Sequence, residues 1–210
     1  MSDRDGRMAL YRMSLDGPAD SARVELLDLT SGEEYAPIWN RNGTELMFTS
    51  DESGTQNVWM WDAVADTVFR LRPDTMKQSV GDFSPDGRSV TIVFQSGDFT
   101  TNEIFLMDRE GGDLEQLTDN ELYDVTPRFS PDGSRIAFCR QHIETTDDGE
   151  QRNGDIFVMD LASREVQRVT TGPAFDCLPA WSPDGSRITY HGCGPDGCFI
   201  HVVEVVSGVT

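Results

Sequence analysis

Phe129-Ser130-Pro131-Asp132-Gly133 is the stretch that decides the fold, because the chain repeats it. Related stretches are Trp39-Asn40-Arg41-Asn42-Gly43, Phe83-Ser84-Pro85-Asp86-Gly87 and Trp181-Ser182-Pro183-Asp184-Gly185. Successive copies are roughly 40 to 50 residues apart, the period of a propeller blade or a solenoid repeat. The chain therefore consists of similar units that stack against one another.

Each copy has the residues of a tight turn between two strands. Proline presets φ near −65°, Asp tolerates the next corner, and Gly accepts a positive φ. Apolar residues alternate after each Gly: Leu46 and Phe48, Val90 and Ile92, Ile136 and Phe138, Ile188 and Tyr190. A period of two predicts a strand. The motif therefore joins the first strand of a unit to its second.

A full unit has four strands. The third strands are expected at 57–62, 103–108, 155–160 and 199–204, and the outer strands end in pairs such as Leu29-Thr30, Leu117-Thr118 and Val169-Thr170. One domain, 1–210, would then hold a partial unit (1–32), three complete units (33–73, 74–120 and 121–172) and a second partial unit (173–210). This division predicts seventeen strands. The chain is then either a segment of a larger ring or a five-bladed ring with one incomplete blade.

The composition excludes some classes of partner. The 210 residues carry 17 basic and 37 acidic side chains, a formal net charge of −20. Binding to a phosphate backbone depends on basic side chains, so nucleic acid is not expected as a partner. No apolar run is long enough to cross a membrane, and the residues after Met1 lack the pattern of a signal peptide. The oligomeric state is open.

Four cysteines do not form a zinc pattern. Cys193 and Cys198 flank Gly-Pro-Asp-Gly at an expected hairpin tip, where two strands can bring the sulfur atoms together. They form a disulfide if the compartment is oxidising. Otherwise all four cysteines, with Cys139 and Cys177 in strands, are free thiols.

These motifs resemble the TolB-type propeller repeat, a WD40-like family with aromatic-Ser-Pro-Asp-Gly turns. The best copy runs from Asp176 to Gly185, and the resemblance covers nearly the whole chain. It implies an all-β propeller of four to five four-stranded antiparallel blades, either alone or within a six-bladed ring. Relatives with this repeat include the periplasmic TolB adaptor, the accessory propellers of prolyl-oligopeptidase-like and tricorn-like peptidases, and oligogalacturonate lyases. The implied location is periplasmic or extracellular.

Four polar residues stand five positions before the repeated aromatic residues: Glu34, Gln78, Asp124 and Asp176. In a ring they would gather near the mouth of the channel and bind a cation or a basic peptide. The alternative is that each one caps backbone N–H groups where its strand begins.

The segment 140–154 is longer than its counterparts and contains His142, Asp147 and Asp148. A long loop on a rigid scaffold is a common place for binding, so these residues join the candidate site. The alternative is a solvated insertion without a role. Its acidic residues lack the ligand spacing of a calcium-binding EF-hand loop.

Motifs for catalysis are lacking. No nucleophile elbow, phosphate loop or dinucleotide motif is present, and His142, His191 and His201 lack a compact metal-ligand spacing. We therefore expect no catalytic residue, metal or cofactor. The favoured function is a non-catalytic scaffold that binds a protein or peptide, and the negative charge favours a basic one. The alternatives are the accessory propeller of a peptidase and, less favoured, a metal-dependent lyase.

Overall fold

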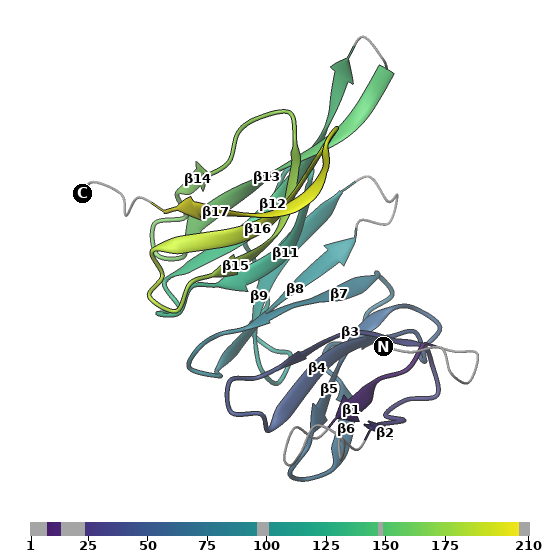
Figure 1. Ribbon diagram of the computed structural model, residues 1–210. Coiled ribbons are helices and arrows are strands. Elements are labelled where there is room, and N and C mark those ends of the chain that lie inside the picture. The colour runs from purple at the N-terminus through teal and green to yellow at the C-terminus, as the bar shows by residue number, and fades with distance from the viewer. Residues whose placement is uncertain (1–7, 14–23, 96–100, 147–148, 206–210) are drawn as a thin grey trace. The chain divides into compact units, whose positions relative to one another are not determined.

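The computed structural model describes residues 8–13, 24–95, 101–146 and 149–205 (Figure 1). The regular elements of this part of the chain are seventeen β-strands, the number that the repeats predict. None of its segments is a helix long and apolar enough to cross a membrane. The chain divides into two compact units, 1–80 and 81–210, which are considered separately.

The first unit contains a strand pair and a four-stranded sheet. Its strands are β1 (Tyr11–Met13), β2 (Val24–Leu26), β3 (Glu34–Trp39), β4 (Glu45–Ser50), β5 (Asn57–Asp62) and β6 (Thr67–Arg70). β1 pairs with β2, and β3 to β6 pair antiparallel in sequence order. Every residue of β4 is buried, and Leu46 and Phe48 pack with Leu10 and Trp61.

The second unit contains most of the remaining strands, and the boundary falls within β7. The strands are β7 (Gln78–Phe83), β8 (Ser89–Gln95), β9 (Asn102–Asp108), β10 (Glu115–Gln116), β11 (Tyr123–Phe129), β12 (Arg135–Thr146), β13 (Gly149–Asp160), β14 (Val166–Arg168), β15 (Phe175–Trp181), β16 (Arg187–Gly194) and β17 (Gly197–Glu204). β7 to β10 and β11 to β14 form two four-stranded antiparallel groups. A parallel pair, Tyr123 with Asn102, joins these groups into one sheet. β15, β16 and β17 form a separate three-stranded sheet.

The apolar core of the second unit lies between successive repeats. One cluster includes Ile104 from β9, Phe129 from β11 and Ile136 from β12. Another includes Ile156 from β13 with Cys177 and Ile188 from the next sheet. Strands β12 and β13 contribute to both clusters, because successive side chains along a strand point to opposite faces of the sheet.

The repeated turn is closed by its own side chains. Ser130 Oγ donates to Asp132 Oδ1 at 2.6 Å and accepts from the N–H of Arg135 at 2.9 Å. Gly133 has φ of 75° and donates to the carbonyl of Ser130. The same contacts recur at the Ser84 and Ser182 turns. At the divergent copy, Asn40 Oδ1 accepts from two backbone N–H groups instead, so the turn survives the loss of Ser-Pro-Asp.

A β-bulge recurs near the start of three inner strands. The pairing register shifts after Tyr35 in β3, after Val125 in β11 and after Cys177 in β15. At each shift the residue before a proline takes a positive φ: Ala36 (49°), Thr126 (53°) and Leu178 (57°). A left-handed conformation costs such residues about 1–2 kcal/mol. The bulge turns the start of the strand relative to the rest of its sheet.

Candidate functional site

The four strand-entry residues, Glu34, Gln78, Asp124 and Asp176, are buried. In the first unit, the Glu34 carboxylate accepts from the N–H groups of Leu10 at 3.1 Å and Thr30 at 2.7 Å. Gln78 accepts from the N–H of Val58 at 3.2 Å and donates to the carbonyl of Arg72. Both side chains satisfy the backbone of the preceding repeat.

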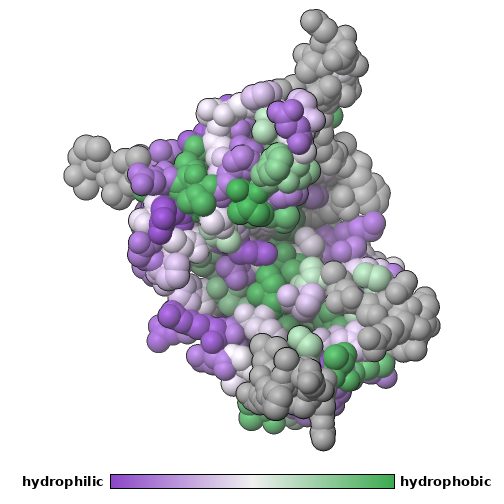
Figure 2. Space-filling model, in the orientation of Figure 1, coloured by the Kyte–Doolittle hydropathy of each residue, from purple (hydrophilic) through white to green (hydrophobic). Residues whose placement is uncertain are grey.

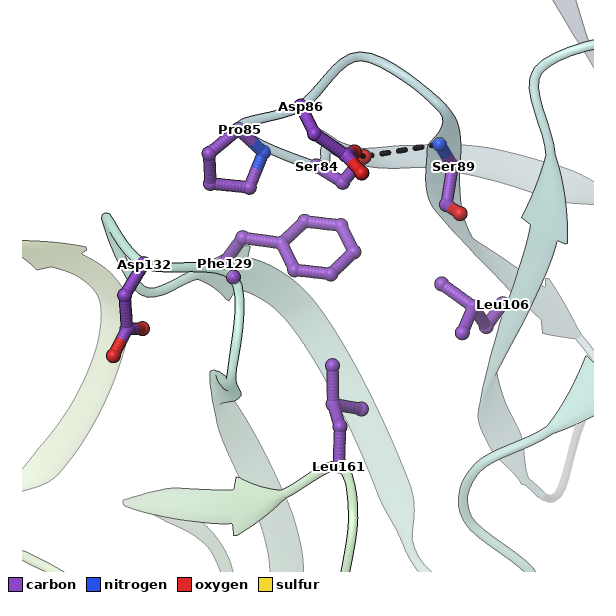
Figure 3. Close-up of a pocket in the computed structure, with 9 residues that line it drawn as sticks. Ser84, Pro85, Asp86, Ser89, Leu106, Phe129, Asp132 and Leu161 are labelled. Carbon is purple, nitrogen blue, oxygen red and sulfur yellow. Dashed lines mark hydrogen bonds between the residues drawn. The ribbon is translucent and has the colours of Figure 1, made fainter.

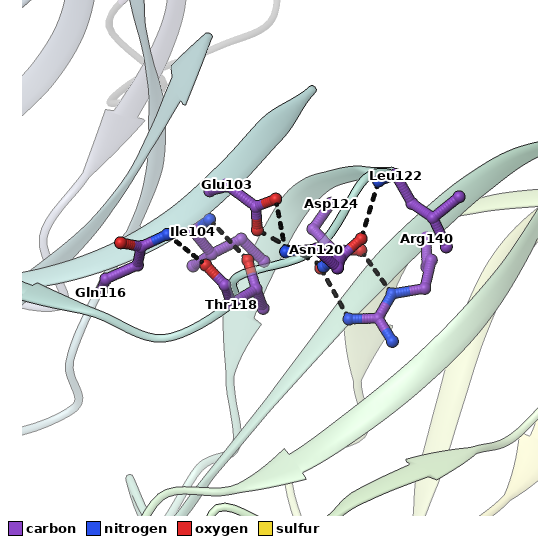
Figure 4. Close-up of polar contacts among 8 residues, drawn as sticks. All are labelled: Glu103, Ile104, Gln116, Thr118, Asn120, Leu122, Asp124 and Arg140. Atoms are coloured by element: carbon purple, nitrogen blue, oxygen red, sulfur yellow. Dashed lines mark hydrogen bonds and ion pairs between the residues drawn. The ribbon is translucent and has the colours of Figure 1, made fainter. Parts of the chain in front are cut away.

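In the second unit, Asp124 forms an ion pair with Arg140. The carboxylate oxygens accept from Arg140 Nε and Nη2 at 2.7 Å each, and Asn120 donates to Oδ2 at 2.8 Å (Figure 4). The Asp124 side chain is 0% exposed and that of Arg140 is 21% exposed. The carboxylate raises the pKa of the Arg140 guanidinium. Each charge of this pair neutralises the other, so Asp124 offers no free carboxylate to a ligand.

Burial is the largest cause of the pKa shifts of two other acidic residues in this unit, Glu103 and Asp176. It raises the pKa of Glu103, which is adjacent to Asp124 and accepts from the N–H of Asn120 (Figure 4). It likewise raises the pKa of Asp176, although a hydrogen bond from Thr170 works in the opposite direction. Desolvation disfavours the charged form of a carboxyl group, so neither residue is a freely solvated anion.

Glu34 and Gln78 thus follow the capping alternative, because they accept from backbone N–H groups, whereas Asp124 accepts from the side chains of Arg140 and Asn120. Two of them belong to the first unit and two to the second, and the structure does not place the four in one ring. The open acidic ring stays a prediction. As they stand, these side chains support the segments where their strands begin and do not present carboxylates to solvent.

The described residues of the long segment 140–154 belong to a β-hairpin and not to an irregular loop. β12 and β13 pair without interruption from Arg135 with Asp160 to Thr146 with Gly149. The hairpin extends beyond the other strands of its unit (Figure 1). His142 is half-buried on it, opposite Asn153, whereas Asp147 and Asp148 lie outside the described residues.

The base of this hairpin is fixed by close packing. Asn153 is buried, and its amide donates to the carbonyl of Gly172 at 3.2 Å. A Cβ atom at Gly154 would meet the Phe175 ring at 3.2 Å and the Asp176 carbonyl at 3.4 Å, so a side chain at this position would crowd its neighbours. The base from which the hairpin extends is therefore rigid.

Exposed apolar and acidic residues lie on the β12–β13 hairpin and beside its base. Ile143, on the hairpin, is 61% exposed. Asp119 and Glu121 are exposed just before β11, whose first residue, Tyr123, pairs with Gln141 at the hairpin base. An exposed apolar side chain and exposed acidic residues thus lie on neighbouring segments, a combination that suits a partner with apolar and basic groups.

A pocket of about 400 Å³ lies between the Ser84 turn and the Phe129 turn (Figure 3). Leu106, Phe129 and Leu161 supply its apolar wall, and Asp86 and Asp132 stand near its rim. The serine hydroxyl of each turn lowers the pKa of the Asp beside it, that of Asp132 to about 2. Because these carboxylates are already hydrogen-bonded within their turns, we assign them a structural role.

The structure pairs all four cysteines. Cys193 bonds to Cys198 at the β16–β17 hairpin, the pair that the sequence suggested. Cys139 on β12 bonds to Cys177 on β15, with Cα atoms 5.0 Å apart. The second pairing was missed, because 38 residues separate the two cysteines and only the packing of successive sheets brings them together.

The exposed edge of the last sheet is apolar. Phe199, Ile200 and Val202 of β17 are more than half exposed, and apolar atoms are visible over β16 and β17 (Figure 2). In the complete repeats, the third strand pairs with an outer strand. Among the described residues, β17 has no such neighbour.

A model of the TolB β-propeller domain family matches residues 20–146, more than half of the chain. The chain belongs to this family. The predicted all-β propeller fold of TolB-like repeats is thereby confirmed.

Curated relatives fall into different functional groups. An uncharacterized protein of Agrobacterium fabrum is 24% identical over 88% of this chain and 62% of its own length. Dipeptidyl-peptidase 5 of Porphyromonas gingivalis is 25% identical over 90% of this chain and 33% of its own length. A TolB homolog of Chlorobium luteolum is 26% identical over 68% of this chain and 43% of its own length. The chain spans less than two thirds of the length of these relatives.

Solved structures show the same fold. A protein assigned as a TolB in Agrobacterium tumefaciens superposes with a TM-score of 0.77 at 21% identity, over 93% of this chain and 70% of that one. The tricorn protease gives a TM-score of 0.62 at 15% identity, over 90% of this chain and 20% of that one. Similarity at these identities establishes the propeller fold and leaves the function to the residues of this chain.

Proposed function

We propose that this TolB-family chain is a non-catalytic scaffold that binds a protein or peptide in the periplasm or outside the cell. The observation that carries the proposal is the β12–β13 hairpin, which holds the exposed Ile143 on a continuous strand ladder. A strand pair anchored at Asn153 and Gly154 loses little conformational freedom on binding. The two disulfides also fit an oxidising compartment.

The charge of the chain indicates the chemistry of the partner. A formal net charge of −20 attracts a basic partner and speeds its encounter. Asp119 and Glu121 are exposed beside the hairpin base, whereas Asp124 is neutralised by Arg140. The expected partner segment therefore carries Lys or Arg next to an apolar residue that covers Ile143.

Selection from a library of random decapeptides tests this function. We expect the chain to enrich peptides that combine basic and apolar residues. Ile143→Ser should weaken their binding about tenfold, since burial of an exposed Ile contributes about 1.5 kcal/mol. Association should also slow as ionic strength rises, because exposed charges separated by more than the Debye length are screened.

Val166→Ser is the matched control. Val166 lies on β14 of the same repeat and is 41% exposed. It pairs with Met159 of β13, whereas Ile143 pairs with Arg152, so its replacement removes a similar apolar side chain far along the strands from Ile143. Equal losses in the two variants, or enrichment of acidic peptides, would count against a binding site on the hairpin.

The alternative function is the accessory propeller of a peptidase. It is favoured by the likeness to dipeptidyl-peptidase 5, which extends over 90% of this chain. In that case the coding sequence continues into a catalytic domain with a Gly-x-Ser-x-Gly nucleophile elbow. Sequencing of the flanking DNA distinguishes the two functions, since a scaffold needs no such motif.

A further inference from the structure

We propose that His191, Cys193 and Cys198 form a zinc site when the Cys193–Cys198 disulfide is reduced. One ligand atom from each residue lies within 4.8 Å of the other two. Two sulfur atoms and one imidazole are a typical donor set for Zn²⁺. The site is independent of the binding function proposed above.

The strand geometry places the three side chains on one face. Cys193 and Cys198 are directly opposed in the β16–β17 pair, so their side chains point to the same side of the sheet. His191 precedes Cys193 by two residues on β16 and therefore shares that face. The ligands come from a rigid hairpin whose register is fixed by eight pairs of residues.

The distances suit a tetrahedral ion after reduction. Cys193 Sγ lies 3.8 Å from each ring nitrogen of His191. Tetrahedral coordination at standard bond lengths needs about 3.6 Å between sulfur and nitrogen and about 3.8 Å between two sulfurs. Two thiol sulfurs that are no longer bonded separate to about 3.5–4.0 Å, the range of nonbonded contacts. Reduction thus moves the sulfur atoms toward the spacing that the ion requires.

Exposure favours reaction at this pair. Cys198 is exposed and Cys193 is half-buried, whereas Cys139 and Cys177 are at most 6% exposed. A dithiol reductant therefore reaches the hairpin tip first. It transfers two electrons and two protons to the Cys193–Cys198 bond and becomes a disulfide itself. When the ion binds, each thiol releases its proton, and solvent can fill the fourth position.

The disulfide and the metal site exclude each other, because both use the same two sulfur atoms. The hairpin tip would therefore respond to redox state, with the ion holding β16 and β17 together after the covalent bond is lost. The charge of −20 adds a general attraction for cations.

Titration with Co²⁺, a spectroscopic substitute for Zn²⁺, tests the site in the full chain. The tip disulfide is reduced with a phosphine, and alkylation with mass spectrometry verifies which cysteines are free. We expect one Co²⁺ per chain with sulfur-to-cobalt charge-transfer absorption, displaced by Zn²⁺. Affinity should be greater at about pH 8 than at about pH 6, since the ligands must lose protons.

Variants and the oxidised protein supply the controls. His191→Ala should lower the affinity about tenfold or more, and Cys193→Ser/Cys198→Ser should abolish the charge-transfer band. His201→Ala removes a histidine of the same sheet that stacks on Tyr190 and should bind like the wild type. The oxidised wild type needs no substitution and should not bind. Equal binding before and after reduction, no charge-transfer band, or full affinity in His191→Ala would overturn the proposal.

Discussion

Arg140 and Asp124 show how one residue pair holds the start of a strand. The pair joins β12 to β11 by two hydrogen bonds of 2.7 Å, and the Arg140 guanidinium also lies over the rings of Phe138 and Phe157. Removal of one partner from a buried pair is costly, because the other charge stays buried without compensation.

Arg140→Ala should destabilise the protein by about 3 kcal/mol. The measurement is urea unfolding at neutral pH. The control is Arg164→Ala, which breaks the exposed pair with Glu115 and should cost less than about 1 kcal/mol. Asp124→Asn added to Arg140→Ala should recover part of the loss, since it removes the unpaired charge. Similar costs for the two single variants would contradict a buried ion pair.

The repeated turn is the element that sets the path of the chain from one strand to the next. Its serine donates to the Asp two residues later, and the pKa of that Asp is about 2 in both the Asp132 and Asp184 turns. A carboxylate that receives hydrogen bonds prefers its charged form. The hydrogen bonds of the turn therefore add to the apolar packing of Phe129 in holding this segment.

Ser130→Ala should raise the pKa of Asp132 toward its ordinary value near 3.9. The present pKa of about 2 lies below that of the unfolded chain. The stabilisation from this charge is therefore full above the ordinary pKa and is lost as pH falls through about 2. In the variant the stabilisation is smaller and its loss is complete at a higher pH, because the folded-state pKa lies closer to that of the unfolded chain. NMR titration of the carboxyl carbons measures the shift, with Asp184 as an internal control, and an Asp132 pKa unchanged near 2 would contradict this account.

At the scale of the whole molecule, contacts between successive sheets close the second unit. The Cys139–Cys177 disulfide joins β12 to β15 within the core shared by two sheets. The exposed Cys193–Cys198 disulfide joins two strands that are already neighbours in one hairpin. The first cross-link closes a far longer segment of chain and should restrict the unfolded state more.

Loss of the Cys139–Cys177 disulfide should therefore cost more stability than loss of the Cys193–Cys198 disulfide. Closure of segments of 38 and 5 residues predicts about 4 and about 2 kcal/mol. Urea unfolding of Cys139→Ala/Cys177→Ala and Cys193→Ala/Cys198→Ala tests this order. Fully reduced wild type separates the effect of the bond from that of the missing sulfur atoms. Equal costs would contradict the argument that the longer closed segment restricts the unfolded state more.

The sequence by itself determined the repeat, the strand order and the propeller family, because turn chemistry and alternation act over a few residues. It also indicated the hairpin-tip cysteines. Only the tertiary structure decided that Glu34, Gln78, Asp124 and Asp176 are buried, since burial depends on the repeat that packs over each strand start. It also turned the expected loop at 140–154 into a continuous strand pair and joined Cys139 to Cys177. These features depend on strand register and on contacts between sheets, which bring together residues that are distant in the chain.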